Sequence, residues 1–112
     1  EAIELAQENA ELNHTTNVSF YTAPTQDFLR DTKDIPDFVI ADPPRKGLGK
    51  KTRKRLLEIL PSRIILMSCN PHSAKEDVEM LKKRYYISYI EAFDMFPYTN
   101  HVEVLAVLDK DQ

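Results

Sequence analysis

The chain has 112 residues, enough for one compact domain, and its apolar and charged content is typical of globular proteins. It contains no apolar run long enough to span a membrane and no signal-peptide pattern, so a membrane protein is not expected. The single cysteine excludes an internal disulfide and a four-cysteine metal or iron–sulfur site, and it fits a reducing, cytoplasmic setting.

The charges are unevenly distributed around a net charge of −3, which by itself does not indicate a nucleic-acid-binding protein. Residues 1–44 hold nine acidic and two basic residues. Seven basic residues then follow within eleven positions: Arg45, Lys46, Lys50, Lys51, Arg53, Lys54 and Arg55. Such a patch could bind phosphates, and the alternative is a helix face that only contacts water.

The spacing of apolar residues, glycines and prolines predicts nine elements. In chain order these are a helix over 2–13, a strand over 18–21, a helical turn over 26–30, a strand over 38–41, a helix over 50–60, a strand over 63–67, a helix over 73–84 and strands over 86–93 and 102–108. The continuous apolar runs at 38–41 and 63–67 are typical of strands buried on both faces. Ser73, with Glu76 three residues later, is the expected cap of the helix that it begins.

Strands that alternate with helices predict a doubly wound α/β fold with a mostly parallel sheet. The last two strands have no helix between them, which predicts an antiparallel edge. Gly47 and Gly49 are the only glycines, so the chain lacks the Gly-rich turn that a nucleotide cofactor needs after the first strand. We therefore expect residues 1–112 to be the C-terminal portion of a larger domain, and the alternative is a complete small domain without a cofactor.

Three polar clusters flank predicted strands, where open α/β sheets bind their ligands. They are Asp42-Pro43-Pro44-Arg45-Lys46-Gly47-Leu48, Ser68-Cys69-Asn70-Pro71 and Phe96-Pro97-Tyr98-Thr99-Asn100-His101-Val102-Glu103.

Each cluster contains a residue type that is reactive or binds ligands. The two prolines after Asp42 fix the backbone and leave carbonyl groups that could accept hydrogen bonds from an amine, although such a turn can also be purely structural. Cys69 follows an apolar strand and precedes a helix, whose N-terminus favours a thiolate, although a lone cysteine is often a small core residue. Glu103 begins an apolar strand, where a carboxylate costs free energy unless it is paired or used, and the alternative is an orientation toward water. His101 has no second histidine at ligand spacing, so we expect no metal site.

Together, and in this order, the three clusters resemble the uracil-5-methyltransferase family that acts on transfer and ribosomal RNA. The helix over 2–12 and the segment 17–20 also resemble that family, so the likeness extends over nearly the whole chain. It implies a partial Rossmann-like methyltransferase fold that uses S-adenosylmethionine.

Family positions imply that Cys69 is the nucleophile, Glu103 the proton acceptor and Asp42 a carboxylate of the cofactor site. The candidate RNA contacts are Arg45, Asn70, Phe96 and His101, with Tyr98 as a further base-stacking candidate.

The chemistry explains these residue types, because carbon 5 of uracil is too weak a nucleophile to take a methyl group directly. A thiolate that adds to carbon 6 makes carbon 5 nucleophilic. After methyl transfer, a base must remove the proton on carbon 5 before the thiolate can leave.

Two alternatives remain open from the sequence. One is a methyltransferase of the same fold that acts on an amine through the Asp42 turn, and that would tolerate the loss of Cys69. The other is an RNA-binding domain with no catalytic activity, which would form no covalent adduct.

Overall fold

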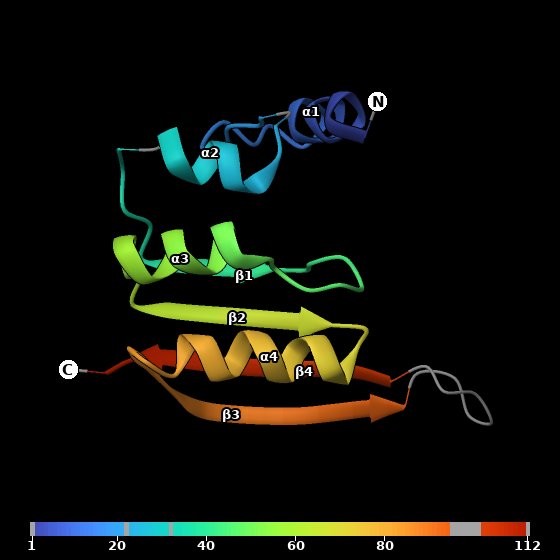
Figure 1. Cartoon of the computed structure of the whole chain (residues 1–112). Helices are drawn as coiled ribbons and strands as arrows, with labels where there is room; N and C mark the ends of the chain where they lie inside the picture. The colour runs from blue at the N-terminus through green and yellow to red at the C-terminus, as the bar shows by residue number, and fades with distance from the viewer. Residues whose placement is uncertain (1, 22, 32, 95–101, 112) are drawn as a thin grey trace.

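The computed structural model describes residues 2–21, 23–31, 33–94 and 102–111. It contains four helices and four strands within these ranges (Figure 1). In chain order they are α1 (Ala2–Leu12), α2 (Thr25–Asp31), β1 (Phe38–Ala41), α3 (Lys50–Ile59), β2 (Arg63–Ser68), α4 (Pro71–Leu81), β3 (Tyr85–Asp94) and β4 (Val102–Lys110).

The strands form a single sheet in the order β1-β2-β4-β3. β1 and β2 pair in parallel, while β4 runs antiparallel to both of its neighbours, β2 and β3. Three strands therefore share one direction, and β4 is inserted between two of them in the opposite direction. The α/β class and the antiparallel edge predicted from the sequence are confirmed, with β3 as the edge strand.

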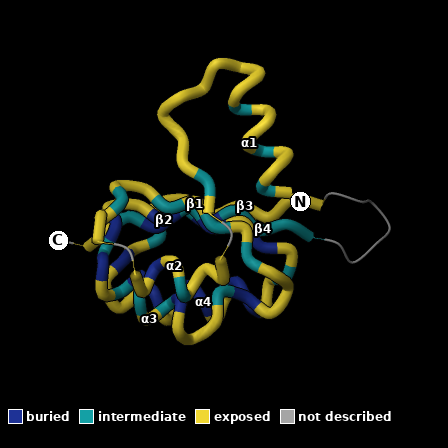
Figure 2. Tube along the Cα trace, turned by 90° about the horizontal axis from the view of Figure 1, so that it is seen from above, coloured by how far each residue is buried: buried dark blue, intermediate teal, exposed yellow. Residues whose placement is uncertain are grey.

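Helices α2, α3 and α4 lie on one side of the sheet, and α1 lies on the other (Figure 2). Ile64, Leu66 and Ser68 of β2 are buried because they face α3 and α4, whereas Arg63, at the start of the strand, and Met67, between Leu66 and Ser68, are exposed. The core lies between the sheet and these helices and consists mainly of aliphatic side chains: Leu29, Leu56, Ile59, Ile64, Leu66, Val78, Leu81, Tyr85, Ala106 and Leu108.

β1 is not buried on both faces, contrary to the expectation from its apolar run. Phe38 is 64% exposed and Ile40 is 72% exposed, while Val39 and Ala41, which alternate with them, pack against the core. Among the described residues, helices α2 to α4 cover only one face of the sheet, and β1 has a strand neighbour only in β2. The expectation failed because an apolar run does not reveal what covers its second face.

Two local predictions were wrong. Residues 18–21 form no strand, because no other described strand lies beside them to accept their backbone hydrogen bonds. Helix α4 begins at Pro71 and is capped by Asn70, whose side chain accepts a hydrogen bond from the His72 amide. Asn70 takes the cap position in place of Ser73 because a proline suits the first position of a helix and extends it by two residues.

Two polar contacts fix the end of the sheet remote from the candidate clusters. Arg63 of β2 stands opposite Asp109 of β4 and donates two hydrogen bonds to its carboxylate, at 2.7 and 3.2 Å. The buried Tyr85 hydroxyl donates to the carbonyl of Pro61, which is itself buried. Burial raises the pKa of Tyr85 to about 12. These contacts hold β2, β3 and β4 in register.

The substitution Tyr85→Phe should lower the free energy of unfolding by about 1 to 2 kcal/mol, because it leaves the buried Pro61 carbonyl without a donor. Urea denaturation near neutral pH measures this loss. Tyr86→Phe, at the exposed neighbouring position, is the matched control and should have no effect.

The stability difference between wild type and Tyr85→Phe should shrink as the pH rises from about 10 to about 12. In this range the unfolded tyrosine has lost its proton and the folded one still holds it, so the free energy of unfolding falls with rising pH. A difference that stays constant over the range would show that burial does not hold the phenol in its neutral form.

Candidate functional site

The sheet topology brings the candidate residues of three chain segments to one end of the sheet. β1 and β2 are parallel, so Asp42 and Cys69, which follow the last residues of these strands, lie at the same end. β4 runs in the opposite direction, so its first residues, Val102 and Glu103, lie there as well. Segments far apart in the sequence therefore meet where polar side chains follow or precede an apolar strand.

Cys69 and Glu103 lie next to the last residue pair that joins β2 and β4. Ser68, the last residue of β2, pairs with Val104, and Glu103 precedes Val104 in β4. Cys69 follows Ser68 in the turn that leads to α4. An exposed thiol and a half-buried carboxylate therefore lie at the same end of this strand pair, an arrangement that suits a nucleophile and a base.

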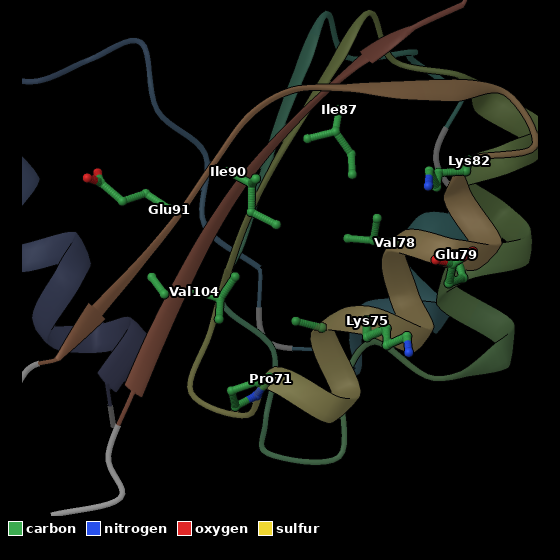
Figure 3. A pocket seen from close by; sticks show the side chains of 11 residues that line it. Pro71, Lys75, Val78, Glu79, Lys82, Ile87, Ile90, Glu91 and Val104 are labelled. Atoms are coloured by element: carbon green, nitrogen blue, oxygen red, sulfur yellow. The ribbon is translucent and has the colours of Figure 1, made fainter.

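Glu103 belongs to the face of the sheet that α4 does not cover. Val104 lines an apolar hollow of about 340 Å³ between α4, β3 and β4, together with Pro71, Val78 and Ile90 (Figure 3). Successive strand residues point to opposite faces, so Glu103 points away from this hollow and from α4.

Asp42 is exposed at the end of β1, beside a smaller hollow of about 250 Å³. Its lining combines the Asp42-Pro43-Pro44 turn with apolar side chains of β1, α2, α3 and the loop before α3: Leu29, Val39, Ile40, Ala41, Leu48 and Leu56. A carboxylate at the rim of an apolar hollow can bind a ligand that carries both a positive charge and an apolar or aromatic part.

The Arg45 backbone is attached to the start of α4. Its carbonyl oxygen accepts hydrogen bonds from the Asn70 side chain at 3.0 Å and from the Ser73 hydroxyl at 2.6 Å. The Asn70 amide also donates to the Ser73 hydroxyl and its oxygen caps the helix, so this side chain is fully engaged inside the chain. Arg45 and Lys46 are exposed on the loop that these bonds hold.

Asp77 is a buried acid that the sequence reasoning missed. Its side chain is only 2% exposed, and it accepts hydrogen bonds from the Leu48 amide at 3.0 Å and from Arg53 at 3.3 Å. Burial raises the pKa of Asp77 despite these two donors, which act in the opposite direction. The available signal was the spacing of 70, 73 and 77, which places three polar side chains on one face of a helix.

The basic patch divides into structural and exposed members. Arg53 pairs with Asp77, and Arg55 donates to the Leu29 carbonyl at 2.7 Å and pairs with Glu58. The other five are exposed: Arg45, Lys46, Lys50, Lys51 and Lys54. These five run from the loop after β1 onto the first turns of α3, so positive charge is available next to the candidate site.

Phe96, Tyr98 and His101 lie outside the described residues. Within the described ranges, His, Cys, Asp and Glu side chains form no group of three or more that could hold a metal ion. In the same ranges, none of the helices is both long enough and apolar enough to cross a membrane.

Comparison with known proteins identifies the family. The model of the tRNA (uracil-5-)-methyltransferase family matches residues 1–111. The chain belongs to this family. The resemblance drawn from the three motifs is therefore confirmed.

Individual relatives agree with this assignment. The chain is 40% identical, over 98% of its length, to an uncharacterised RNA methyltransferase of Caldanaerobacter subterraneus, of which it covers 25%. It is 39% identical, over 99% of its length, to the 23S rRNA (uracil(747)-C(5))-methyltransferase of Shewanella baltica, of which it covers 29%. The chain spans between a quarter and a third of the length of these relatives.

A solved structure confirms the fold. The Pyrococcus abyssi tRNA (uracil-54, C5)-methyltransferase, in complex with S-adenosyl-L-homocysteine, matches 96% of this chain with 41% identity and a TM-score of 0.78. The chain covers 26% of that protein. The Rossmann-like methyltransferase fold implied by the motifs is thus confirmed.

Cys69 should react with a thiol reagent in the folded chain, because its side chain is exposed. We expect one equivalent of Ellman's reagent to be consumed at the same rate before and after addition of a denaturant at low concentration. Cys69→Ser, which removes the only thiol, is the control and should give no signal. A thiol that reacts only after unfolding would contradict the exposed position.

Proposed function

We propose that this chain is the C-terminal portion of the catalytic domain of an RNA (uracil-5-)-methyltransferase. The reaction is transfer of a methyl group to carbon 5 of uridine in ribosomal or transfer RNA. The observation that carries the proposal is the pairing of β1, β2 and β4, which brings Asp42, Cys69 and Glu103 to the same end of the sheet. Family membership and the names of the relatives support the substrate class.

Cys69 is the proposed nucleophile. Its thiolate adds to carbon 6 of the uracil ring, forming a carbon–sulfur bond, and the electron pair of the carbon 5–carbon 6 double bond moves to carbon 5 and the carbonyl at carbon 4. Carbon 5 thereby becomes the nucleophile toward the methyl group. Cys69 is exposed just before the N-terminus of α4, where its sulfur is accessible to a substrate.

Glu103 is the proposed base of the second half of the reaction. Once carbon 5 carries the new methyl group, the Glu103 carboxylate removes the remaining proton from that carbon. The electrons of the broken carbon–hydrogen bond restore the ring double bond and expel the Cys69 thiolate. The half-buried position of Glu103 on the uncovered face allows it to contact a base that has left its stack.

The residues around Asp42 fit S-adenosylmethionine. The cofactor combines positive charge with an adenine ring, and the Asp42 carboxylate at the rim of an apolar hollow has the matching chemistry. Asp42 would hold a positively charged or hydrogen-bond-donating part of the cofactor, and the turn at Pro43 and Pro44 would fix that carboxylate. When bound, the cofactor supplies the methyl group as an electrophile.

The exposed basic residues are the proposed RNA contacts. Arg45 lies on the loop nearest the site and could bind a phosphate next to the target uridine. Asn70 is a weaker candidate, because its side chain already serves Arg45, Ser73 and the helix cap. Phe96 and His101 stay predictions, and so does a cytoplasmic setting.

The cofactor site proposed for this chain is partial. The chain contains no Gly-rich turn, and its relatives are three to four times as long as the part that they share with it. We therefore propose that the first strands and the Gly-rich loop belong to a longer protein, and the enzymatic tests below use that protein.

The longer protein should form a covalent adduct with RNA that contains 5-fluorouridine. Fluorine on carbon 5 cannot leave as a proton, so the adduct should accumulate and appear as a shifted band on a denaturing gel. Cys69→Ala should abolish both the band and turnover, and Glu79→Gln, at an exposed position on α4, is the control that should retain both. Turnover without a band would favour the amine-directed reaction through the Asp42 turn.

Glu103→Gln should reduce turnover about 10²- to 10⁴-fold, the usual range for loss of a general base. The defect should lie after methyl transfer, so a methylated adduct should accumulate on RNA with ordinary uridine. Radioactivity from methyl-labelled cofactor that remains bound to the denatured protein measures this. If turnover falls and no label is retained, Glu103 acts before methyl transfer and the proposed role is wrong.

A further inference from the structure

The loop of residues 43–49 is attached to α4 by three side chains from one face of that helix. Asn70 and Ser73 donate to the Arg45 carbonyl, and Asp77 accepts from the Leu48 amide. Residues 70, 73 and 77 recur at the helical period, so the same face of α4 contacts the loop over two turns. The backbone of the loop is thus held at two points.

Gly47 allows the closest approach between loop and helix. A Cβ atom on Gly47 would lie 2.9 Å from the Asp77 carboxylate and 3.3 Å from the Cβ of Ser73. Its φ of +93° is also one that residues with a side chain rarely adopt. The backbone turns there, with the Gly47 amide donating to the Pro44 carbonyl at 2.8 Å, so that the next amide reaches Asp77.

Asp77 also joins α3 to this arrangement through Arg53. The pair is buried, with side-chain exposures of 2% for Asp77 and 12% for Arg53. One carboxylate therefore connects the loop, the helix after the loop and the helix that follows Cys69. Such an arrangement is stiff, because moving α3 away from α4 separates the buried Asp77 from Arg53, and moving the loop removes the hydrogen bond of the Leu48 amide.

We propose that Asp77 is a positioning residue of the methyltransferase site, because it fixes loop 43–49 to the helix that begins just after Cys69. The loop starts at the Asp42 turn, and the helix starts at the Cys69 turn. Asp77 thereby fixes the distance between Asp42, the proposed cofactor-binding residue, and Cys69, the proposed nucleophile, although it touches neither. This inference rests on the proposed function.

The test compares wild type, Asp77→Ala, Asp77→Asn, Gly47→Ala and the double variant Asp77→Ala/Gly47→Ala in the longer protein, at a temperature where circular dichroism shows all five to be folded. Two readouts are needed: hydrogen exchange at the Leu48 amide, which is independent of activity, and kcat and KM for S-adenosylmethionine. Glu79→Gln, on the same helix, is the control.

We expect Asp77→Ala to expose the Leu48 amide to exchange and to lower kcat/KM by about 10²-fold, as misplacement of a reacting group by about 1 Å can do. Asp77→Asn keeps an oxygen acceptor for that amide and should lose less. Gly47→Ala disturbs the same contact from the loop side. In the double variant Asp77→Ala/Gly47→Ala, the losses should be less than additive, because the carboxylate that the new Cβ meets is gone.

The proposal is overturned if Asp77→Ala has the same exchange rate at the Leu48 amide and the same kcat/KM as the wild type. This holds even if the variant unfolds at a lower temperature, because Asp77 would then only stabilise the fold. Additive losses in the double variant would also overturn it. The wild-type enzyme could also prove inactive while Asp77→Ala still increases hydrogen exchange at the Leu48 amide. That result would support the attachment of the loop by Asp77 and would reject the proposed function instead.

Discussion

The candidate site depends on the antiparallel pairing of β2 with β4. The two strands are separated by α4 and β3 in the chain, and the end of β2 meets the start of β4 only because β4 runs in reverse between β2 and β3. A slip by one residue would move Glu103 to the α4 side of the sheet. The bidentate contact of Arg63 with Asp109 at the far end of the pair opposes such a slip.

The second constraint acts beyond the strand ends, where backbone pairing no longer determines geometry. The Asp42 turn and the Cys69 turn leave adjacent parallel strands, and both continue into segments that meet at Asp77. Polar side chains of α4 therefore hold the loops in fixed positions, as backbone pairing holds the strands. The proposed catalytic groups can remain accessible to a substrate because buried contacts next to them hold the loops in place.

The sequence predicted the parts of the fold that depend on local pattern and motif order. The strand pair, the helices and the positions of Asp42, Cys69 and Glu103 at strand ends follow from periodicity and from prolines that stop strands. It could not reveal that Phe38 and Ile40 are exposed, because burial depends on which elements cover a face. Asp77 was also missed, since an acid within a polar helix looks like a surface residue until its partners Leu48 and Arg53 are known.

The most direct test of the central geometry is a disulfide between positions 69 and 103. Two cysteines can be bridged when their Cα atoms are about 4.4 to 6.8 Å apart, and residues opposite each other in an antiparallel pair fall in this range. Under mild oxidation, Glu103→Cys should lose both free thiols and about two mass units, while Leu105→Cys, which lies opposite Met67, should keep its thiols free within the monomer. Two alkylatable thiols in oxidised, monomeric Glu103→Cys would contradict the proposal that Cys69 lies next to Glu103, one residue beyond the Ser68–Val104 pair.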